Sequence, residues 1–357
     1  MYKAGVIGLG RMGAFGSEKV KKHSPICWWP IAHSDAINRN EHLILHALCD
    51  KEPKQLEFCS KHYLPNETYL NAKELIQKSP IDLLSIATRT IGRCALIKHA
   101  YQNGIKAIHA EKPLCNSVSE LKELEEIFSD PQFYFTLGTI RRYMPNYRLC
   151  RDLIRKKTYG KLKKIKFKLG LAPLYWSHPH TLDLFLFFNE GATVSTVKAS
   201  LLNVEKCRNE ITIYSDPLVD SASIKFDNDV ECIIDTASGL DLELECEHAS
   251  IIVKNDGEFV EIRPNYNGLA PEAILTLNDN DKQKQHGTFL PIELLRGCLS
   301  GHIGSINENK IIKNDIVMSQ KISFALIRSH LAGSLEVDLE DSEFVINILA
   351  NTNGLPA

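Results

Sequence analysis

Short apolar runs alternate with longer amphipathic stretches over the first 138 residues of the chain. The apolar runs predict strands at Tyr2–Gly8, Leu43–Asp50, Asp82–Thr88, Ile105–Ala110 and Phe133–Leu137. The amphipathic stretches predict helices at Ala72–Lys78, Arg93–Asn103 and Ser119–Phe128. Strands that alternate with helices in this way predict right-handed βαβ units and one parallel sheet.

The pattern changes after residue 138, where long strand-like runs replace the alternation. Strands are predicted at Lys161–Gly170, Thr193–Val204, Asn209–Tyr214, Ala222–Phe226, Val230–Thr236, Leu242–Cys246 and Ala249–Val253. Helices are predicted at Arg148–Lys157, Thr181–Phe188 and Leu290–Leu299. We therefore predict two domains. Residues 1–138 form an α/β domain, and residues 139–357 form an α+β domain with a large, mainly antiparallel sheet.

A glycine motif follows the first predicted strand directly. Gly8, Gly10 and Gly13 form the pattern G-x-G-x-x-G, with Arg11 and Met12 inside it. Gly8 permits a tight turn, Gly10 lets the backbone approach a pyrophosphate, and Gly13 lets helix and strand pack closely. At the start of a βαβ series this motif predicts a dinucleotide-binding Rossmann domain over residues 1–138. All five residues are expected to contact the cofactor.

Asp50 ends the second predicted strand, where an acidic residue binds the adenosine ribose in such domains. Asp50 lies 37 residues after Gly13, whereas about 20 residues separate the two positions in most such domains. This difference predicts an insertion of about 15 residues within Ala14–Pro30. The insertion is either a surface excursion or a flap near the ligand. The carboxylate of Asp50 favours NAD, because it would repel a 2′-phosphate. The neighbouring Lys51 could attract that phosphate, so NADP stays the alternative.

Composition narrows the possible classes of function. The 357 residues carry a formal net charge of −2, which argues against a nucleic-acid binder that relies on a basic field. No apolar run is long enough to span a membrane, and the N-terminus does not resemble a signal peptide. The ten cysteines include no CxxC pair and no convincing zinc site, so we expect reduced thiols, a cytoplasmic location and no bound metal.

Two further segments, taken with the glycines, point to a known family. They are Ala110-Glu111-Lys112-Pro113 after the fourth predicted strand and the segment Thr139–Pro145, which reads TIRRYMP. Together the three segments resemble the Gfo/Idh/MocA family of oxidoreductases, which includes glucose–fructose oxidoreductase and inositol dehydrogenase. The resemblance implies a nicotinamide cofactor, a sugar, polyol or nucleotide-sugar substrate, and a homodimer or homotetramer.

The resemblance also implies roles for particular residues. Lys112 would lie beside the nicotinamide and stabilise the charge that develops on the substrate oxygen, and Glu111 would contact the cofactor. In the second domain, His180 matches the family's catalytic histidine and would be the general base. Asp183 matches the second family aspartate and is expected at the substrate-binding site, where it would orient the backbone or pack under the site rather than perform chemistry.

Two departures from the family pattern lie close to His180. Trp176 occupies the place of the family's first aspartate, and its indole can stack on a sugar face but cannot take a proton. His178 could compensate for that loss. Both residues are predicted to bind substrate, although His178 and His180 could also serve only for capping and packing before the apolar run that follows.

Several arginines are expected at the carboxyl ends of strands, where ligands bind in open α/β sheets. Thr88 and Arg89 are predicted to contact the cofactor, and Arg93 to bind an anion of the substrate. Salt bridging at the surface is the alternative. One of Arg141 and Arg142 is expected to bind substrate, and we name Arg141; the other would pack outward.

These observations favour an NAD(P)-dependent dehydrogenase or reductase acting on CH–OH groups of a sugar, sugar acid or nucleotide sugar. A regulatory protein that binds NAD(P) without turnover is the second hypothesis, because Trp176 replaces an aspartate. An enzyme that retains NAD and performs net non-redox chemistry is the third. Runs such as ASIKF and VECIIDTA would leave an apolar sheet face if unpaired, which supports a homo-oligomer.

Overall fold

A computed structural model describes residues 1–16, 24–204, 210–265, 272–276, 286–339 and 345–348. The chain divides into two compact units. The first unit comprises Met1–Ser24, Trp28–Ile140 and Gln285–Val317, and the second comprises Pro25–Cys27, Arg141–Lys284 and Met318–Ala357. The predicted domain boundary after residue 138 lies close to Ile140, where the chain passes from the first unit to the second. The prediction did not include residues 285–317 in the first unit.

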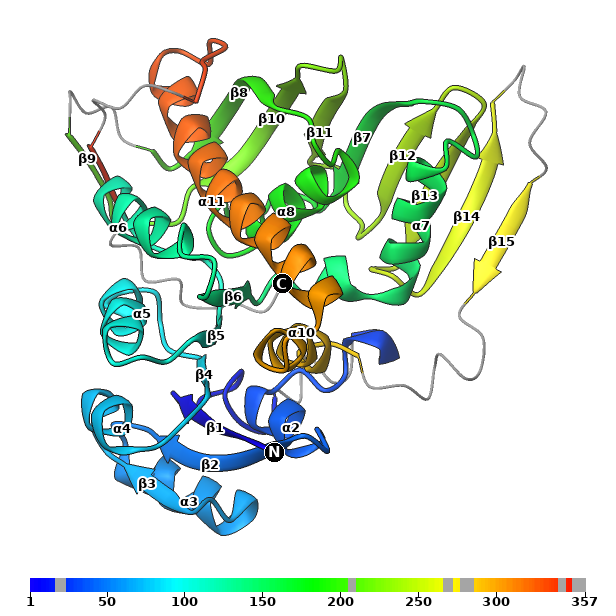
Figure 1. The fold of residues 1–357 in the computed structure, drawn as a ribbon. Helices are drawn as coiled ribbons and strands as arrows, with labels where there is room; N and C mark the ends of the chain where they lie inside the picture. Colours follow the sequence, from blue (N-terminus) through cyan, green and yellow to red (C-terminus); the bar gives the residue numbers. More distant parts are fainter. Residues whose placement is uncertain (17–23, 205–209, 266–271, 277–285, 340–344, 349–357) are drawn as a thin grey trace. The chain divides into compact units, whose positions relative to one another are not determined.

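The first unit contains a six-stranded sheet in which every strand pairs in parallel with its neighbours. Its strands are β1 (Tyr2–Ile7), β2 (Leu43–Cys49), β3 (Glu67–Tyr69), β4 (Leu83–Ile86), β5 (Ala107–Ala110) and β6 (Tyr134–Leu137). The strand order is β3-β2-β1-β4-β5-β6, which is the Rossmann order (Figure 1). The strand order reverses between β1 and β4, and ligands bind at the carboxyl ends of the strands at such a point.

Helices flank this sheet. They are α2 (His33–Asn38), α3 (Pro53–Tyr63), α4 (Ala72–Lys78), α5 (Arg93–Gln102), α6 (Val118–Phe128) and α10 (Phe289–Leu299). Side chains of Asn71 and Ser117 accept hydrogen bonds from backbone N–H groups at the starts of α4 and α6, which fixes where those helices begin. The strands carry the core, since Val6, Leu48 and Leu83 are fully buried.

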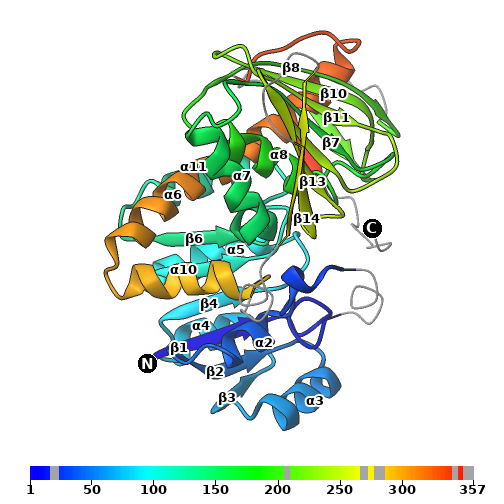
Figure 2. The ribbon, with the colours of Figure 1, turned by 90° about the vertical axis from the view of Figure 1, so that its right-hand side faces the viewer.

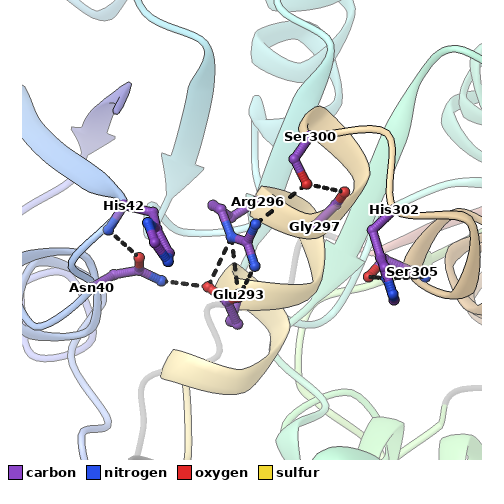
Figure 3. A network of polar contacts seen from close by, with 8 residues as sticks. All are labelled: Asn40, His42, Glu293, Arg296, Gly297, Ser300, His302 and Ser305. Carbon is purple, nitrogen blue, oxygen red and sulfur yellow. Dashed lines mark hydrogen bonds and ion pairs between the residues drawn. The ribbon is translucent and has the colours of Figure 1, made fainter.

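Helix α10 comes from the far end of the sequence but packs on α2, β5 and β6. Polar contacts on one side of α10 help to hold it there (Figure 3). Asn40 donates from Nδ2 to Glu293 Oε2 over 2.8 Å, and Arg296 donates from Nε to Glu293 Oε1 over 3.0 Å. The carboxylate of Glu293 therefore links α10 to the end of α2.

The helix that should follow the glycine motif is interrupted. Ala14 donates to Gly10 O, as in a first helical turn, but the carbonyls of Met12 and Gly13 accept from His33 and Ser34 at 2.8 and 3.0 Å. In a continuous helix the donors would lie four positions along the chain. The segment between Ala14 and α2 is thus inserted into the helix, where the spacing of Gly13 and Asp50 predicts an insertion.

The second unit contains an eight-stranded sheet with the order β15-β14-β13-β12-β7-β11-β10-β8. Its strands are β7 (Leu162–Lys168), β8 (Val194–Leu202), β10 (Leu218–Phe226), β11 (Glu231–Asp235), β12 (Leu242–Cys246), β13 (Ala249–Lys254), β14 (Phe259–Pro264) and β15 (Ala273–Thr276). Within this sheet β7 and β11 pair in parallel and the other neighbours pair antiparallel, which confirms the predicted sheet type. A separate parallel pair joins β9 (Glu210–Ile213) and β16 (Val345–Ile348).

Helices α7 (Pro145–Arg155) and α8 (Pro179–Phe188) lie on one face of this sheet (Figure 2). The long helix α11 (Ile303–Leu331) begins in the first unit and ends in the second, where Ser329 Oγ accepts from the backbone N–H of Ala199 on β8. None of the helices that the structure describes is both long and apolar enough to cross a membrane.

The two faces of the large sheet differ in polarity. Ile224 and Ile234, from the runs ASIKF and VECIIDTA, are buried within the single chain. The opposite face carries charges of alternating sign on neighbouring strands. Glu231 pairs in register with Lys225 and Lys164, and Lys164 Nζ lies 3.0 Å from Glu231 Oε2. The apolar-face argument for a second copy is therefore not supported.

Candidate functional site

The glycine turn leaves β1 with the geometry that a dinucleotide site needs. Gly8 has φ +89°, and a Cβ there would lie 3.0 Å from backbone atoms of Ala87. A Cβ on Gly13 would lie 1.8 Å from Gly8 O, so this position admits only glycine. A Cβ on Gly10 would meet no described atom within 4 Å. The backbone at Gly10 is thus open to a phosphate, and the residues of this turn fit a bound dinucleotide.

Asp50 lies directly beside this turn at the end of β2. Its Oδ2 accepts from Leu9 N over 2.6 Å, and its Oδ1 accepts from Glu52 N over 2.9 Å. Gln55 Nε2 donates to Leu9 O over 2.6 Å, so both backbone groups of Leu9 are held. Each carboxylate oxygen can accept a second hydrogen bond, as a ribose hydroxyl would require. Lys51 is exposed next to it.

The loop after β4 carries Thr88 and Arg89, which lie at the carboxyl end of the parallel strands as predicted. Arg89 is exposed, and Thr88 Oγ1 donates to its carbonyl over 3.0 Å. Arg93 is different. It begins α5, is 1% exposed, and its guanidinium donates to the backbone carbonyls of Thr88, Glu111 and Pro113. The expectation that Arg93 binds an anion is corrected, because the side chain is buried and three backbone carbonyls of the protein accept from its Nη1 and Nη2.

Lys112 follows β5 and is the one residue between Ala107 and Cys115 that is not buried. Its neighbour Glu111 points inward, and Glu111 Oε1 lies 3.1 Å from His33 Nε2. Burial alone would raise the pKa of Glu111, but the hydrogen bond and charge of His33 outweigh it, and the pKa falls to about 2. Glu111 is therefore a buried carboxylate that supports the turn containing Lys112.

Glu111 belongs to a buried polar cluster that the sequence analysis missed. His33 Nδ1 lies 2.6 Å from Ser85 Oγ on β4, and the His33 ring lies 4.8 Å from that of His109 on β5. His109 Nδ1 lies 2.9 Å from Thr136 Oγ1 on β6, and burial lowers its pKa to about 3. A signal was present, since Ser85 and His109 stand inside apolar strands of a sheet covered on both faces. Buried polar groups in such strands need hydrogen-bond partners.

In the second unit, α8 places a single half-exposed residue in a buried helix. Nine of its ten residues are buried, and His180 is the exception. His178 caps the helix and is fully buried, with Nδ1 3.2 Å from Thr181 Oγ1. Burial lowers the pKa of His178 to about 3. His180 thus has the accessible position expected of a general base. The buried surroundings of His178 fit instead the capping and packing role that the sequence left open.

Asp183 and Trp176 also have internal partners. Asp183 is buried on α8, and its Oδ1 lies 3.1 Å from Arg142 Nη1. Arg142 therefore does not pack outward as expected. Trp176 is half-buried, and its backbone N–H donates to Asp216 Oδ2 over 2.9 Å. Asp216 likewise accepts from Tyr175 N, so an aspartate that the sequence analysis missed holds the backbone at Trp176.

Arg141, the predicted substrate ligand, forms a buried pair with Asp256 in the turn between β13 and β14. Its Nη2 donates to Asp256 Oδ2 over 2.9 Å, and Nε donates to Oδ1 over 2.5 Å. Tyr147 donates from its hydroxyl to the same carboxylate over 3.2 Å. The charge of Arg141 is thus matched inside the unit, which speaks against its role as an anion ligand.

Each unit therefore gathers its own share of the predicted residues. The first unit brings together Gly8, Gly10, Gly13, Asp50, Thr88, Glu111 and Lys112 at the carboxyl ends of its strands. The second brings Trp176, His178, His180 and Asp183 to the start of α8. Among the described residues, no group of His, Cys, Asp and Glu could hold a metal ion.

Residues 2–138 match the model of a family described as an oxidoreductase family with an NAD-binding Rossmann fold, GFO_IDH_MocA. The match spans 137 of the 357 residues, so the likeness to that family is shown for this part of the chain. The resemblance inferred from the glycines and from Glu111-Lys112-Pro113 is thereby confirmed, and the cofactor of this fold is NAD. The comparison with curated proteins found no match.

Solved structures of similar fold cover nearly the whole chain. A scyllo-inositol dehydrogenase from Lactobacillus casei, with bound NAD(H) and scyllo-inositol, is 17% identical with a TM-score of 0.64, over 95% of this chain and 99% of that one. A myo-inositol 2-dehydrogenase from Lactobacillus plantarum is 19% identical with a TM-score of 0.62, over 94% and 99%. An oxidoreductase from Agrobacterium radiobacter, in complex with NAD+, L-tartaric acid and magnesium, is 16% identical with a TM-score of 0.69, over 95% and 98%. At these identities the likeness shows the fold.

Proposed function

We propose that the protein is an NAD-dependent dehydrogenase or reductase that acts on a carbinol or carbonyl carbon of a sugar-like substrate. The observation that carries this proposal is the accessibility of two residues. Lys112 and His180 are the half-exposed members of otherwise buried segments, Ala107–Cys115 and α8. Each segment thus exposes the one side chain that the family resemblance assigns to the chemistry.

The proposed roles follow from the two functional groups. When bound, NAD would accept or supply the hydride at its nicotinamide ring. The ammonium group of Lys112 would stabilise negative charge on the substrate oxygen as the proton leaves or arrives. The imidazole of His180 would take or return that proton, since imidazole is the side-chain group whose unperturbed form changes charge near neutral pH. Gly10 would admit the pyrophosphate, and Asp50 would bind the adenosine ribose.

We propose that the substrate is an uncharged sugar or polyol rather than a sugar acid or nucleotide sugar. Four arginines suggested an anion, but Arg93, Arg141 and Arg142 are buried with acceptors inside their own units. Recruiting Arg141 or Arg142 to a ligand would break a buried ion pair, which costs about 3–5 kcal/mol. Arg89 is exposed and stays the candidate contact for a cofactor phosphate.

We infer a homodimer or homotetramer from the family resemblance, and a cytoplasmic location from the cysteines. The nine cysteines in the described parts of the chain are all buried and free of disulfides, which suits a reducing compartment. If the charged face of the large sheet, which carries Lys164, Lys225 and Glu231, lies in the interface, its charges would have to pair with those of the second copy. Light scattering of the purified protein tests the oligomer, and a monomer would contradict it.

A turnover screen tests the proposed function. Wild type, Lys112→Met and His180→Ala would be assayed by nicotinamide absorbance with NAD and NADP against polyols, sugars, sugar acids and nucleotide sugars. Cofactor binding would be measured by fluorescence in the same samples. We expect turnover of an uncharged polyol or sugar with NAD, reduced by about 100-fold or more in both variants with cofactor binding retained.

Other outcomes separate the competing functions. Cofactor binding without turnover by wild type, together with Trp176 at the aspartate position, would favour an NAD-binding regulator. Product formation without a net change in nicotinamide absorbance would favour a non-redox enzyme that retains NAD. Turnover that survives in Lys112→Met would contradict the role proposed for Lys112.

A further inference from the structure

The turn Glu111-Lys112-Pro113 is tied to the neighbouring loop by the side chain of Arg93. Arg93 Nη1 donates to the backbone carbonyls of Glu111 and Pro113, and Nη2 donates to the backbone carbonyl of Thr88. Lys112 therefore lies between two residues whose carbonyl groups share one nitrogen of the guanidinium. Through the same side chain, the turn after β5 is linked to the loop after β4.

The position of Arg93 is costly without such a role. It is the first residue of α5, where the helix dipole disfavours a positive charge, and the first turn of α5 has no acidic residue. Its side chain is 1% exposed, and burial lowers its pKa to about 10, which leaves it charged at neutral pH. A buried guanidinium is stable only where acceptors meet its donors. Here the carbonyls on either side of Lys112 and that of Thr88 in the loop after β4 accept from Nη1 and Nη2, while Nε has no hydrogen-bond partner among the described residues.

The side chain of Glu111 holds the same turn from another direction. Its Oε1 lies 3.1 Å from His33 Nε2, and a Cβ on Gly138 would lie 2.9 Å from that oxygen. The carboxylate is thus enclosed, while Arg93 holds the backbone on both sides of Lys112. The side chain of Lys112 is the part of this turn that stays accessible.

We propose that Arg93 is a positioning residue, which fixes the backbone on both sides of Lys112 and so gives the ammonium group one place relative to the cofactor site. This proposal rests on the proposed function of Lys112. The fork of a guanidinium can bind carbonyls of two loops at once, whereas a lysine ammonium is a compact point charge. A displacement of about 1 Å at a reacting group can lower the rate by about 100-fold.

The test compares Arg93→Met, Arg93→Lys and wild type, with Arg296→Met as the matched control. Arg296 belongs to the same unit and is likewise held by an internal acceptor, in its case the carboxylate of Glu293 on α10. Three quantities are measured: hydrogen exchange of backbone amides at residues 111–116, the rate of reductive methylation of Lys112, and the affinity for NAD. Lys61, which is largely exposed, serves as the internal reference for methylation.

In Arg93→Met we expect exchange at residues 111–116 to rise about tenfold or more while exchange in β1 and β2 stays unchanged. We expect faster methylation of Lys112 and a lower affinity for NAD. On a turned-over substrate, kcat should fall by about 100-fold with little change in KM. Arg93→Lys should be intermediate in each quantity, and Arg296→Met should resemble wild type at residues 111–116.

The proposal is overturned if exchange and methylation at the turn match wild type in a folded Arg93 variant. It is equally overturned if exchange rises by the same factor throughout the first unit, which would indicate a general structural role. Should Arg93→Met fail to fold, Arg93→Lys and Arg93→Gln decide by the same measurements. Exchange and methylation need no substrate, so an absence of turnover would contradict the proposed function while leaving this test intact.

Discussion

His33 Nε2 lies 3.1 Å from Glu111 Oε1, although 78 positions of sequence separate the two residues. The contact exists because the helix after the glycine motif is interrupted and resumes at His33, which donates from its backbone to Met12. The insertion thus brings an imidazole to the place where a continuous helix would put another residue. Glu111 in turn precedes Lys112, so the insertion acts on the predicted catalytic turn through one buried pair.

Acid is expected to destabilise the first unit through this cluster. Burial, with the charge of His33, lowers the pKa of His109 to about 3, below its ordinary value of about 6.5. Its stabilising contribution is therefore complete above pH 6.5 and is lost as the pH falls toward 3, by up to about 1.4 kcal/mol per pH unit. Glu111, whose pKa is about 2, contributes above about pH 4.5 and loses that contribution as the pH falls through 2.

His109→Asn tests this expectation. Between pH 6.5 and 4.5, the variant should show a shallower dependence of the free energy of unfolding on pH than wild type. Urea titrations at several pH values measure that slope. Equal slopes for the variant and wild type would contradict the assignment of the proton uptake to His109.

The glycines of the turn should respond differently to the same substitution. Gly10→Ala adds a methyl group that meets no described atom within 4 Å, so the fold should be retained. That methyl group would stand where the pyrophosphate approaches, and we expect the affinity for NAD to fall about tenfold or more. Gly13→Ala would place its methyl group 1.8 Å from Gly8 O and should destabilise the unit. Thermal unfolding and NAD fluorescence titrations distinguish the two, and normal NAD affinity in Gly10→Ala would contradict the site.

Asp50→Asn should weaken NAD binding and reduce the preference of the protein for NAD over NADP. The amide keeps the size of the side chain but removes the charge that would repel a 2′-phosphate. Asp82 offers a matched control, because its Oδ2 accepts from Lys3 N over 2.8 Å just as Asp50 Oδ2 accepts from Leu9 N. Asp82 precedes β4, at the amino end of the sheet. Dissociation constants for both cofactors are measured, and the same ratio of constants in Asp50→Asn and wild type would exclude Asp50 from cofactor choice.

Sequence patterns predicted the parallel sheet and the large antiparallel sheet because their strands are long or clearly apolar. They missed α11, which is 29 residues long. The reason lies in residues such as Asn309 and Lys313, which look like solvent-facing positions but are buried. Asn309 Nδ2 donates to Phe135 O, and Lys313 Nζ donates to Phe133 O, so the polar side of α11 covers the edge strand β6.

The candidate site was predictable where a motif fixes a backbone position, as for Gly8, Gly13 and Lys112. It was not predictable where the partner of a charge decides its role. Arg93 and Arg141 looked alike as free cations, yet one binds backbone carbonyls and the other pairs with Asp256. Such partners lie far away in sequence, and no local pattern identifies them.

The ion pair of Arg142 and Asp183 separates a structural role from a role in substrate binding. Both side chains are almost fully buried, whereas Arg155 and Glu190 are 47% and 33% exposed. Asp183→Asn removes the carboxylate charge that lies beside a buried guanidinium and should lower the free energy of unfolding by about 3–5 kcal/mol. Arg155→Ala should cost about 1 kcal/mol or less.

The double variant Arg142→Met/Asp183→Leu completes this prediction. It removes both charges and fills the site with apolar side chains, so it should recover most of the stability lost in Asp183→Asn. Urea unfolding measures the recovery, and KM for the turned-over substrate is measured in the same protein. A stable double variant with normal KM would show that Asp183 supports α8 and His180 without touching the substrate. A stable double variant whose KM is raised about tenfold would place Asp183 at the substrate, as the family resemblance implies.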